Sequence, residues 1–216
     1  MDLYTRRRVM RREQLDEIGG PAVFVANHNS HMDTPVILRA LPPRWRRRTA
    51  VAAAADYFYA KRRIALSVSL VFGTVPLDRN SGAGVGPSQT AHLDRHFATG
   101  GSLLVFAEGT RSRDGRVGRL RSGAARLAAE HGLPIVPIFV SGTAATMPRG
   151  RKWMVFRGGR PGPRHPLEIR FGESIAVPPG EPPTEVMERV RRFFAECGAE
   201  TAAVARAAPE QPREPA

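Results

Sequence analysis

Short apolar runs alternate along the chain with amphipathic segments, and this alternation predicts strands and helices in turn. The apolar runs have strand length and lie at residues 21–26, 51–55, 71–77, 102–106, 133–140 and 167–171. The segments that predict helices are residues 34–41, 60–70, 88–99, 120–131 and 184–200. The alternation predicts an α/β fold in a single domain, with a mostly parallel, partly mixed central sheet flanked by helices.

Three polar clusters each follow an apolar run at the point where a predicted strand ends. They are residues 28–33, 78–79 and 108–111. In an open α/β sheet the carboxyl ends of parallel strands line one crevice. If the three strands run parallel, we expect the clusters to meet at that edge.

The first cluster contains a histidine and an aspartate in a spacing that suits general base catalysis. His28 and Asp33 are five residues apart, so on a continuous helix their side chains would point away from each other. In a turn that enters a helix, the carboxylate can accept the imidazole N–H and leave the other ring nitrogen free as a base. The activated hydroxyl would then belong to the substrate.

Other interpretations of this cluster remain open. A hydrogen-bonded turn with a capping aspartate needs no catalysis, and for a histidine–aspartate pair alone it is the simpler interpretation. His28, His31 and Asp33 resemble a metal-ligand set, but no further cluster in the sequence completes it. The sequence has no G-x-S-x-G elbow, which argues against a serine hydrolase.

Length and composition are those of one folded domain with a strongly basic surface. We expect one domain over residues 1–206 and a disordered tail over residues 207–216. The net charge of +13 comes from 31 arginines and two lysines against 20 acidic residues. Such a surface attracts phosphorylated substrates, anionic membranes or nucleic acid, or is simply solvated.

Cysteine content and hydropathy predict an intracellular protein. The single cysteine, Cys197, cannot form an internal disulfide, and its helical spacing predicts core packing. The arginine-rich start lacks the apolar region of a signal peptide, and the longest nearly uncharged run, residues 64–77, is shorter than the roughly 20 residues that cross a bilayer. We therefore expect a cytoplasmic protein without a spanning segment.

Both tryptophans lie among basic residues. Trp45 has arginines on both sides, and Trp153 follows Arg151 and Lys152. Aromatic and basic residues together suit an anionic membrane surface. Packing of either indole at the edge of the core is the alternative.

Four sequence blocks resemble the glycerolipid acyltransferase family, the lysophosphatidate acyltransferases and their relatives. In family order they are NHNSHMD at residues 27–33, GTVPLDR at 73–79, FAEGTRS at 106–112 and IVPIFV at 135–140. Agreement in both order and spacing is far more specific than any single motif. Two departures are Ala107, where the family usually has proline, and the absence of the N-terminal membrane helix of many members.

The resemblance implies a role for each matching position. His28 would be the base and Asp33 its orienting partner. The residues that would hold the acceptor are Arg79, Glu108, Gly109, Thr110 and Arg111, with Pro137 lining the same pocket. Arginine forks suit phosphate, whereas the Glu108 carboxylate would repel it, so we expect Glu108 to bond an acceptor hydroxyl or to hold an arginine.

The resemblance further implies transfer of a fatty acyl group from acyl-CoA or acyl carrier protein to a lysophospholipid. We expect 1-acyl-sn-glycerol 3-phosphate as the acceptor, no metal or other cofactor, and peripheral contact with the anionic cytoplasmic face of the membrane. Nucleic acid is not expected as a partner. The rival hypotheses are a non-catalytic phospholipid- or nucleic-acid-binding module, and a thioesterase or metal-dependent hydrolase that uses the same histidine.

Overall fold

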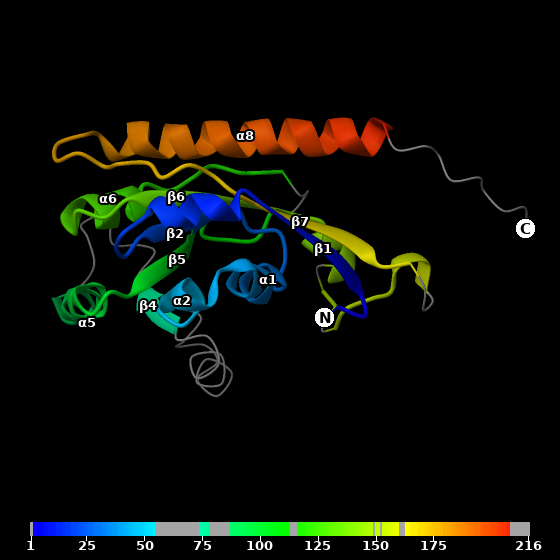
Figure 1. The fold of residues 1–216 in the computed structure, drawn as a ribbon, viewed down its shortest axis with the longest axis horizontal. Coiled ribbons are helices and arrows are strands. Elements are labelled where there is room, and N and C mark those ends of the chain that lie inside the picture. Colours follow the sequence, from blue (N-terminus) through cyan, green and yellow to red (C-terminus); the bar gives the residue numbers. More distant parts are fainter. Residues whose placement is uncertain are drawn as a thin grey trace, which may run out of the picture.

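A seven-stranded sheet forms the centre of the structure, which is a computed structural model (Figure 1). It describes residues 2–54, 74–77, 87–112, 116–148, 150–151, 153–159 and 163–207. The strands are β1 (Thr5–Met10), β2 (Val23–Ala26), β3 (Thr49–Ala54), β4 (Thr74–Leu77), β5 (Ser102–Phe106), β6 (Ile135–Ser141) and β7 (His165–Phe171). Their order across the sheet is β1-β7-β6-β2-β5-β3-β4.

Five neighbouring strands of this sheet are parallel. β6, β2, β5, β3 and β4 share one direction, whereas β7 pairs antiparallel with β6, and β1 pairs parallel with β7. The predicted α/β fold with a mostly parallel, partly mixed sheet is confirmed. Each of the six predicted strands is present, with ends within a few residues of the predicted ones.

The strand β1 was not predicted from the hydrophobic pattern. Its sequence, TRRRVM, is dominated by arginine, and Arg6 and Arg8 are exposed. β1 pairs with β7 alone among the described strands and lies at the edge of the sheet. Edge strands tolerate charged side chains, which also discourage pairing with another chain. A pattern search for apolar alternation therefore misses such a strand.

Helices cover both faces of the sheet, and four of the five predicted ones are present. They are α1 (Asp33–Ala40), α5 (Pro87–Ala98), α6 (Gly123–Glu130) and α8 (Pro183–Ala207). The predicted helix over residues 60–70 lies outside the described residues, as do residues 208–216 of the predicted tail. The short elements are α2 (Pro43–Arg46), α7 (Thr143–Thr146), η1 (Arg12–Glu17) and η2 (Arg157–Gly159). No helix in the described ranges is both long and apolar enough to span a bilayer.

Apolar side chains form a layer on each face of the sheet. Side chains of α5, α6 and α8 pack on one face, and those of η1, α1 and α2 pack on the other. All four residues of β2 are buried, as expected for a central parallel strand that is covered on both sides. Cys197 is buried in the α8 layer, so its predicted core position is confirmed.

The two tryptophans have opposite surroundings. Trp45 is 6% exposed and packs edge to face against Phe24, with ring centroids 5.4 Å apart. Trp153 is 71% exposed. The membrane interpretation is therefore wrong for Trp45, because its ring contributes to the core, and it remains a prediction for Trp153.

The parallel register of β2 and β5 brings the first and third polar clusters side by side. Ala26 pairs with Phe106, and the Ala107 N–H donates to the Ala26 carbonyl at 3.3 Å. The chain leaves both strands at the same height, so the segments that follow are neighbours. β4 ends at the same edge of the sheet, but residues 78–79 that follow it lie outside the described residues.

Candidate active site

The turn after β2, residues 27–33, closes around the carboxylate of Asp33. Asp33 Oδ2 lies 2.8 Å from His28 Nδ1 and accepts the backbone N–H groups of Asn29 at 2.6 Å and Ser30 at 2.8 Å. The Asp33 side chain is fully buried in the first turn of α1, where the helix dipole favours a negative charge. We call residues 27–33 the His28 turn.

This bonding fixes the tautomer of His28. An ionised carboxylate only accepts hydrogen bonds, so Nδ1 carries the proton that it donates to Asp33. Nε2 is then the unprotonated nitrogen, and it has no hydrogen-bond partner within the described part of the chain. The imidazole stacks on Phe106 with ring centroids 4.1 Å apart, and 17% of the side chain is exposed. His28 thus presents a free basic nitrogen from a fixed ring.

The predicted start of α1 differs from the observed one. The helix was predicted to begin at residue 34, but α1 begins at Asp33, and its N-cap residue is Met32. The Asp33 side chain reaches back to the backbone of the turn instead. The same carboxylate therefore organises the start of the helix and holds the imidazole.

Asn27 fastens the His28 turn to β6. Its side-chain amide donates to the Val140 carbonyl at 2.9 Å and accepts the Val140 N–H at 2.7 Å. The Ser30 hydroxyl donates to the Met147 carbonyl at 3.0 Å. Sequence reasoning did not identify the role of Asn27. The signal was an amide at the end of a buried strand, since a side-chain amide carries both a donor and an acceptor and can bond both backbone groups of one residue.

Glu108 holds the His28 turn to the loop after β5, residues 107–122, which we call the Glu108 loop. Its Oε1 accepts the His28 backbone N–H at 2.9 Å, and its Oε2 accepts the Gly118 N–H at 2.9 Å. This differs from both expected roles, because the carboxylate binds the protein's own backbone and neither an acceptor hydroxyl nor an arginine is required. Glu108 is a positioning residue for His28.

A second backbone bond keeps the two segments together. The Ser112 N–H donates to the His28 carbonyl at 2.7 Å. Because Glu108 and Ser112 both bond to the backbone of His28, the residues between them, Gly109, Thr110 and Arg111, are held next to the His28 turn. The structure therefore brings these predicted site residues together.

Gly109 allows a close approach of the basic part of this loop. Its φ of +70° lies in the left-handed region, and a Cβ there would lie 2.9 Å from Arg121 Nε. The Arg121 N–H donates to the Ala107 carbonyl at 2.9 Å, which returns the loop to its start. A larger residue at Gly109 would displace the Arg121 side chain.

Arg111 adds positive charge beside the His28–Asp33 pair. The pKa of His31 is lowered, first by partial burial of its ring and then by the positive charge of Arg111 and the neighbouring His28. The lowered pKa favours the neutral form of the His31 ring. The positive charge of Arg111 therefore favours binding of an anion at this part of the site.

One predicted site residue, Pro137, is not brought to this cluster. Pro137 is paired with Val25 in the middle of β6, and its ring lies over Gly172 together with Phe193 of α8. His28 stacks on Phe106 on the opposite face of the sheet, so Pro137 does not line its pocket. The cause is the alternation of side chains along a strand. Arg79 lies outside the described residues.

Metal ligation has no cluster to support it in the part of the chain that the structure describes. No group of three or more His, Cys, Asp or Glu side chains there could hold a metal ion. In the first cluster, the N–H donors of the turn occupy Asp33 Oδ2.

Comparison with known proteins identifies the family of the chain. The model of the Acyltransferase family matches residues 6–141, which include the His28 turn, the Glu108 loop and β6. The chain belongs to the acyltransferase family. The predicted membership of this family is thereby confirmed.

Named acyltransferases are among the proteins that this chain resembles. A chloroplastic 1-acyl-sn-glycerol-3-phosphate acyltransferase of Brassica napus is 33% identical over 155 residues, which are 68% of this chain and 40% of the relative. The corresponding enzyme of Arabidopsis thaliana is 33% identical over 149 residues, 68% of this chain and 39% of the relative. The chain thus spans about two fifths of the length of these curated relatives.

A solved structure has the same fold. The crystal structure of the 1-acyl-sn-glycerophosphate acyltransferase of Thermotoga maritima superposes with a TM-score of 0.65 at 22% identity, covering 90% of this chain and 73% of that one. The α/β acyltransferase architecture described above is therefore shared.

Ala107 departs from the usual family proline without disturbing the site. Its N–H extends the β2–β5 ladder by the bond to Ala26. Proline lacks this donor, so the alanine adds one hydrogen bond at the point where the Glu108 loop begins.

Proposed function

We propose that this protein is an O-acyltransferase that moves a fatty acyl group from an acyl thioester to the free hydroxyl of a lysophospholipid. The observation that carries the proposal is the His28–Asp33 pair, which holds the proton on Nδ1 and leaves Nε2 open. A positioned base of this kind contributes about 100- to 10,000-fold in rate.

The reaction needs no protein nucleophile. His28 Nε2 removes the proton of the acceptor hydroxyl as its oxygen attacks the thioester carbonyl carbon. The tetrahedral intermediate then collapses, the carbon–sulfur bond breaks, and the thiolate receives the proton from His28. Buried Asp33 stabilises the transient imidazolium. The Asn29 and Ser30 N–H groups are bonded to Asp33, so they do not stabilise the oxyanion.

The proposed acceptor is 1-acyl-sn-glycerol 3-phosphate. Arg111 is charged and lies beside the catalytic turn, and a guanidinium can bind phosphate with two parallel hydrogen bonds. The names of the plant relatives support the same acceptor. Acyl-CoA and acyl carrier protein are both suitable donors for a surface with a net charge of +13. We place the enzyme at the cytoplasmic face of the membrane, where this lipid would be reached.

The test follows labelled palmitate from palmitoyl-CoA to lysophosphatidic acid in detergent micelles, with acyl carrier protein as the alternative donor. His28→Ala should lower kcat by at least about a hundredfold while the protein still unfolds in one cooperative thermal transition. His92→Ala is the matched control, because His92 is an exposed histidine of α5. Its turnover should equal that of the unmodified protein.

Two outcomes would contradict the proposal. Near-normal turnover by His28→Ala would show that His28 is not the general base. Release of palmitate to water at the same rate with and without acceptor would identify a thioesterase instead.

A further inference from the structure

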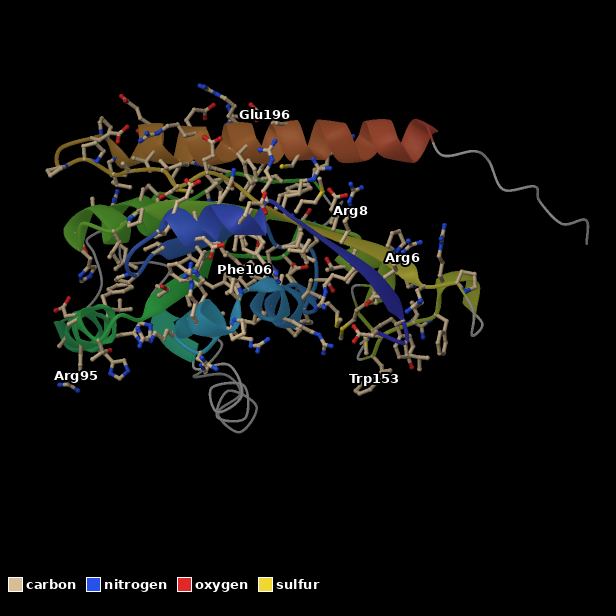
Figure 2. All side chains as sticks on the ribbon, viewed as in Figure 1. Arg6, Arg8, Arg95, Phe106, Trp153 and Glu196 are labelled. Atoms are coloured by element: carbon tan, nitrogen blue, oxygen red, sulfur yellow. The ribbon has the colours of Figure 1, made fainter. Side chains whose placement is uncertain are left out.

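Two large apolar side chains that are far apart in the sequence, Leu3 and Trp153, project from one corner of the molecule. Leu3 is 68% exposed and Trp153 is 71% exposed, and they are the large hydrophobic residues that stand exposed among the described ones. In Figure 2, Trp153 projects at the end of the molecule where β1 begins, and Figure 1 places the N-terminus at the same corner. Exposure of this kind marks an interaction surface when the residues lie together.

Direct contacts link the two segments that carry these side chains. The ring of Tyr4, next to Leu3, stacks on Phe156 with centroids 4.4 Å apart. The His165 N–H donates to the Tyr4 carbonyl at 2.8 Å, and Arg164 Nη1 donates to the Asp2 carbonyl at 3.3 Å. The start of the chain is therefore fixed against the segment between β6 and β7. We call this surface, with Leu3, Trp153 and the stacked pair beneath them, the Trp153 corner.

The charge around the Trp153 corner is of one sign. Residues 142–167 contain six basic residues and no acidic one, and residues 3–12 contain five arginines and no acidic one. The exposed arginines of these segments in the described part of the chain include Arg6, Arg8, Arg151, Arg157 and Arg164. The nearby acid Asp2 is already paired with Arg39 at 2.7 Å. An anionic partner would meet no opposing charge here.

A hydrogen bond links the Trp153 corner to the His28 turn. Met147, at the start of the segment that carries Trp153, accepts the hydrogen bond of the Ser30 hydroxyl. The Val155 N–H donates to the Thr146 carbonyl at 2.8 Å and closes the segment into a loop. A surface bound by this loop is therefore held at a fixed position relative to His28.

We propose that the Trp153 corner docks the protein on an anionic lipid bilayer, with Trp153 and Leu3 inserted at the interface and the surrounding arginines on lipid headgroups. Indole rings favour the membrane interface, and each basic residue near an anionic surface adds attraction. A second copy of this chain fits less well, because a two-fold contact would press the same positive surface against itself. Nucleic acid would use the arginines, but it would not use Leu3.

The corner accounts for membrane contact through surface side chains alone. Docking would help catalysis by bringing the His28 turn close to a lipid acceptor in the membrane. This benefit rests on the proposed function. Binding itself does not depend on the reaction. Docking and turnover are therefore measured separately.

The first experiment measures flotation of the full chain with vesicles of phosphatidylcholine alone, and of phosphatidylcholine with about one third phosphatidylglycerol. We expect binding to the anionic vesicles only. The variant with Leu3→Ser and Trp153→Ser should bind at least about tenfold more weakly, because its interfacial apolar area is lost. Both side chains are exposed, so the thermal unfolding curve should not change.

Matched arginine variants test the electrostatic part. Arg157→Ala should weaken binding about fivefold, the effect expected for one basic residue at an anionic surface. Arg95→Ala removes the same charge from α5 at the opposite end of the molecule, as Figure 2 shows, and should bind like the unmodified protein. If the two variants lost vesicle binding equally, the effect would come from net charge alone, and the proposed docking site would be wrong.

Tryptophan fluorescence reports insertion directly, because the chain has only two tryptophans and Trp45 is buried. Emission should shift to the blue with anionic vesicles and stay constant in Trp153→Phe. Unchanged emission of the bound protein, protection of Trp153 by dimerisation, or binding to a single-stranded RNA oligonucleotide in place of vesicles would each overturn the proposal.

Turnover separates this proposal from the proposed function. His28→Ala should bind vesicles normally and transfer no acyl group. The Leu3 and Trp153 double variant should keep its turnover with a short-chain, monomeric lysophosphatidate and lose it with acceptor embedded in vesicles. Loss of both turnovers in the double variant would contradict a docking role.

Discussion

The two segments that meet at the candidate site are built differently. The His28 turn is closed on itself, with Asp33 fully buried and bonded to three donors of the same turn. The Glu108 loop is open and basic, with Thr110 and Arg116 exposed, and two backbone bonds to His28 hold its first part in place. The His28 turn fixes the position of the imidazole nitrogen Nε2, and the Glu108 loop carries positive charge beside it.

This difference predicts how each segment contributes to the reaction. A closed hydrogen-bonded turn sets the orientation of the base, so changes there should lower kcat. In the proposed function, the exposed basic loop would bind the acceptor before reaction, so changes there should raise the KM for the acceptor. Glu108 connects the two segments, and its effect should fall between these cases.

The largest effect is expected inside the His28 turn. Asp33→Ala removes the acceptor of His28 Nδ1 and of two backbone N–H groups, so kcat should fall by at least about a hundredfold. The free energy of unfolding should fall by about 1–3 kcal/mol, because buried donors lose their partner. Steady-state kinetics and urea denaturation measure both. A rise in acceptor KM at constant kcat would contradict the assignment.

The next effect concerns the link between the segments. Glu108→Gln replaces one carboxylate oxygen with an NH2 group, which cannot accept a hydrogen bond from a backbone N–H. The His28 turn should then be held less firmly, and kcat should fall by about tenfold. Acceptor KM should change less. Glu130→Gln on α6 is the matched control, since Glu130 is exposed. A KM effect that exceeds the kcat effect would instead support contact between Glu108 and the acceptor.

A smaller effect is expected in the open segment. Arg111→Ala should raise acceptor KM by about tenfold, because a hydrogen bond to phosphate is lost, with kcat little changed. Arg111→Lys keeps the charge and should show an intermediate KM. An unchanged KM for the acceptor in both variants would show that Arg111 does not bind the acceptor.

The same pair of variants tests the charge at His31. The pKa of His31 is lowered by partial burial and by Arg111, so in Arg111→Ala it should rise, as an NMR titration would show. The unfolded chain binds the His31 proton more readily than the folded one, so stability falls as pH drops from the ordinary histidine pKa of about 6.5. Arg111→Ala should weaken this acid sensitivity, and no change would contradict the proximity of the two charges.

The smallest effect is expected where the two segments begin. Ala107→Pro restores the residue that the family usually has and removes one hydrogen bond to Ala26, at a cost of about 1 kcal/mol in unfolding free energy. Turnover should remain within about twofold, because Glu108 and Ser112 still hold His28. A large loss of kcat would mean that the start of the Glu108 loop controls the base.

Much of this site was predictable because local chemistry limits what its residues can do. A histidine and an aspartate five residues apart can meet only in a turn, and glycine beside arginine favours a close backbone approach. Glu108 was assigned incompletely, because a carboxylate that accepts backbone N–H groups from two segments cannot be recognised by composition. Pro137 was misplaced for a similar reason: its block matched the family, but strand alternation turned its ring to the other face.

The sequence by itself determined the alternation of strands and helices, the basic surface and the His28–Asp33 pair, because periodicity and spacing are local properties. Only the tertiary structure decided the edge position of β1, which a pattern of arginines conceals, and the opposite fates of two tryptophans with similar neighbours. Trp45 meets Phe24 across the core, and Trp153 has no such cover. Burial depends on what packs against a residue from elsewhere in the chain, and that information is not local.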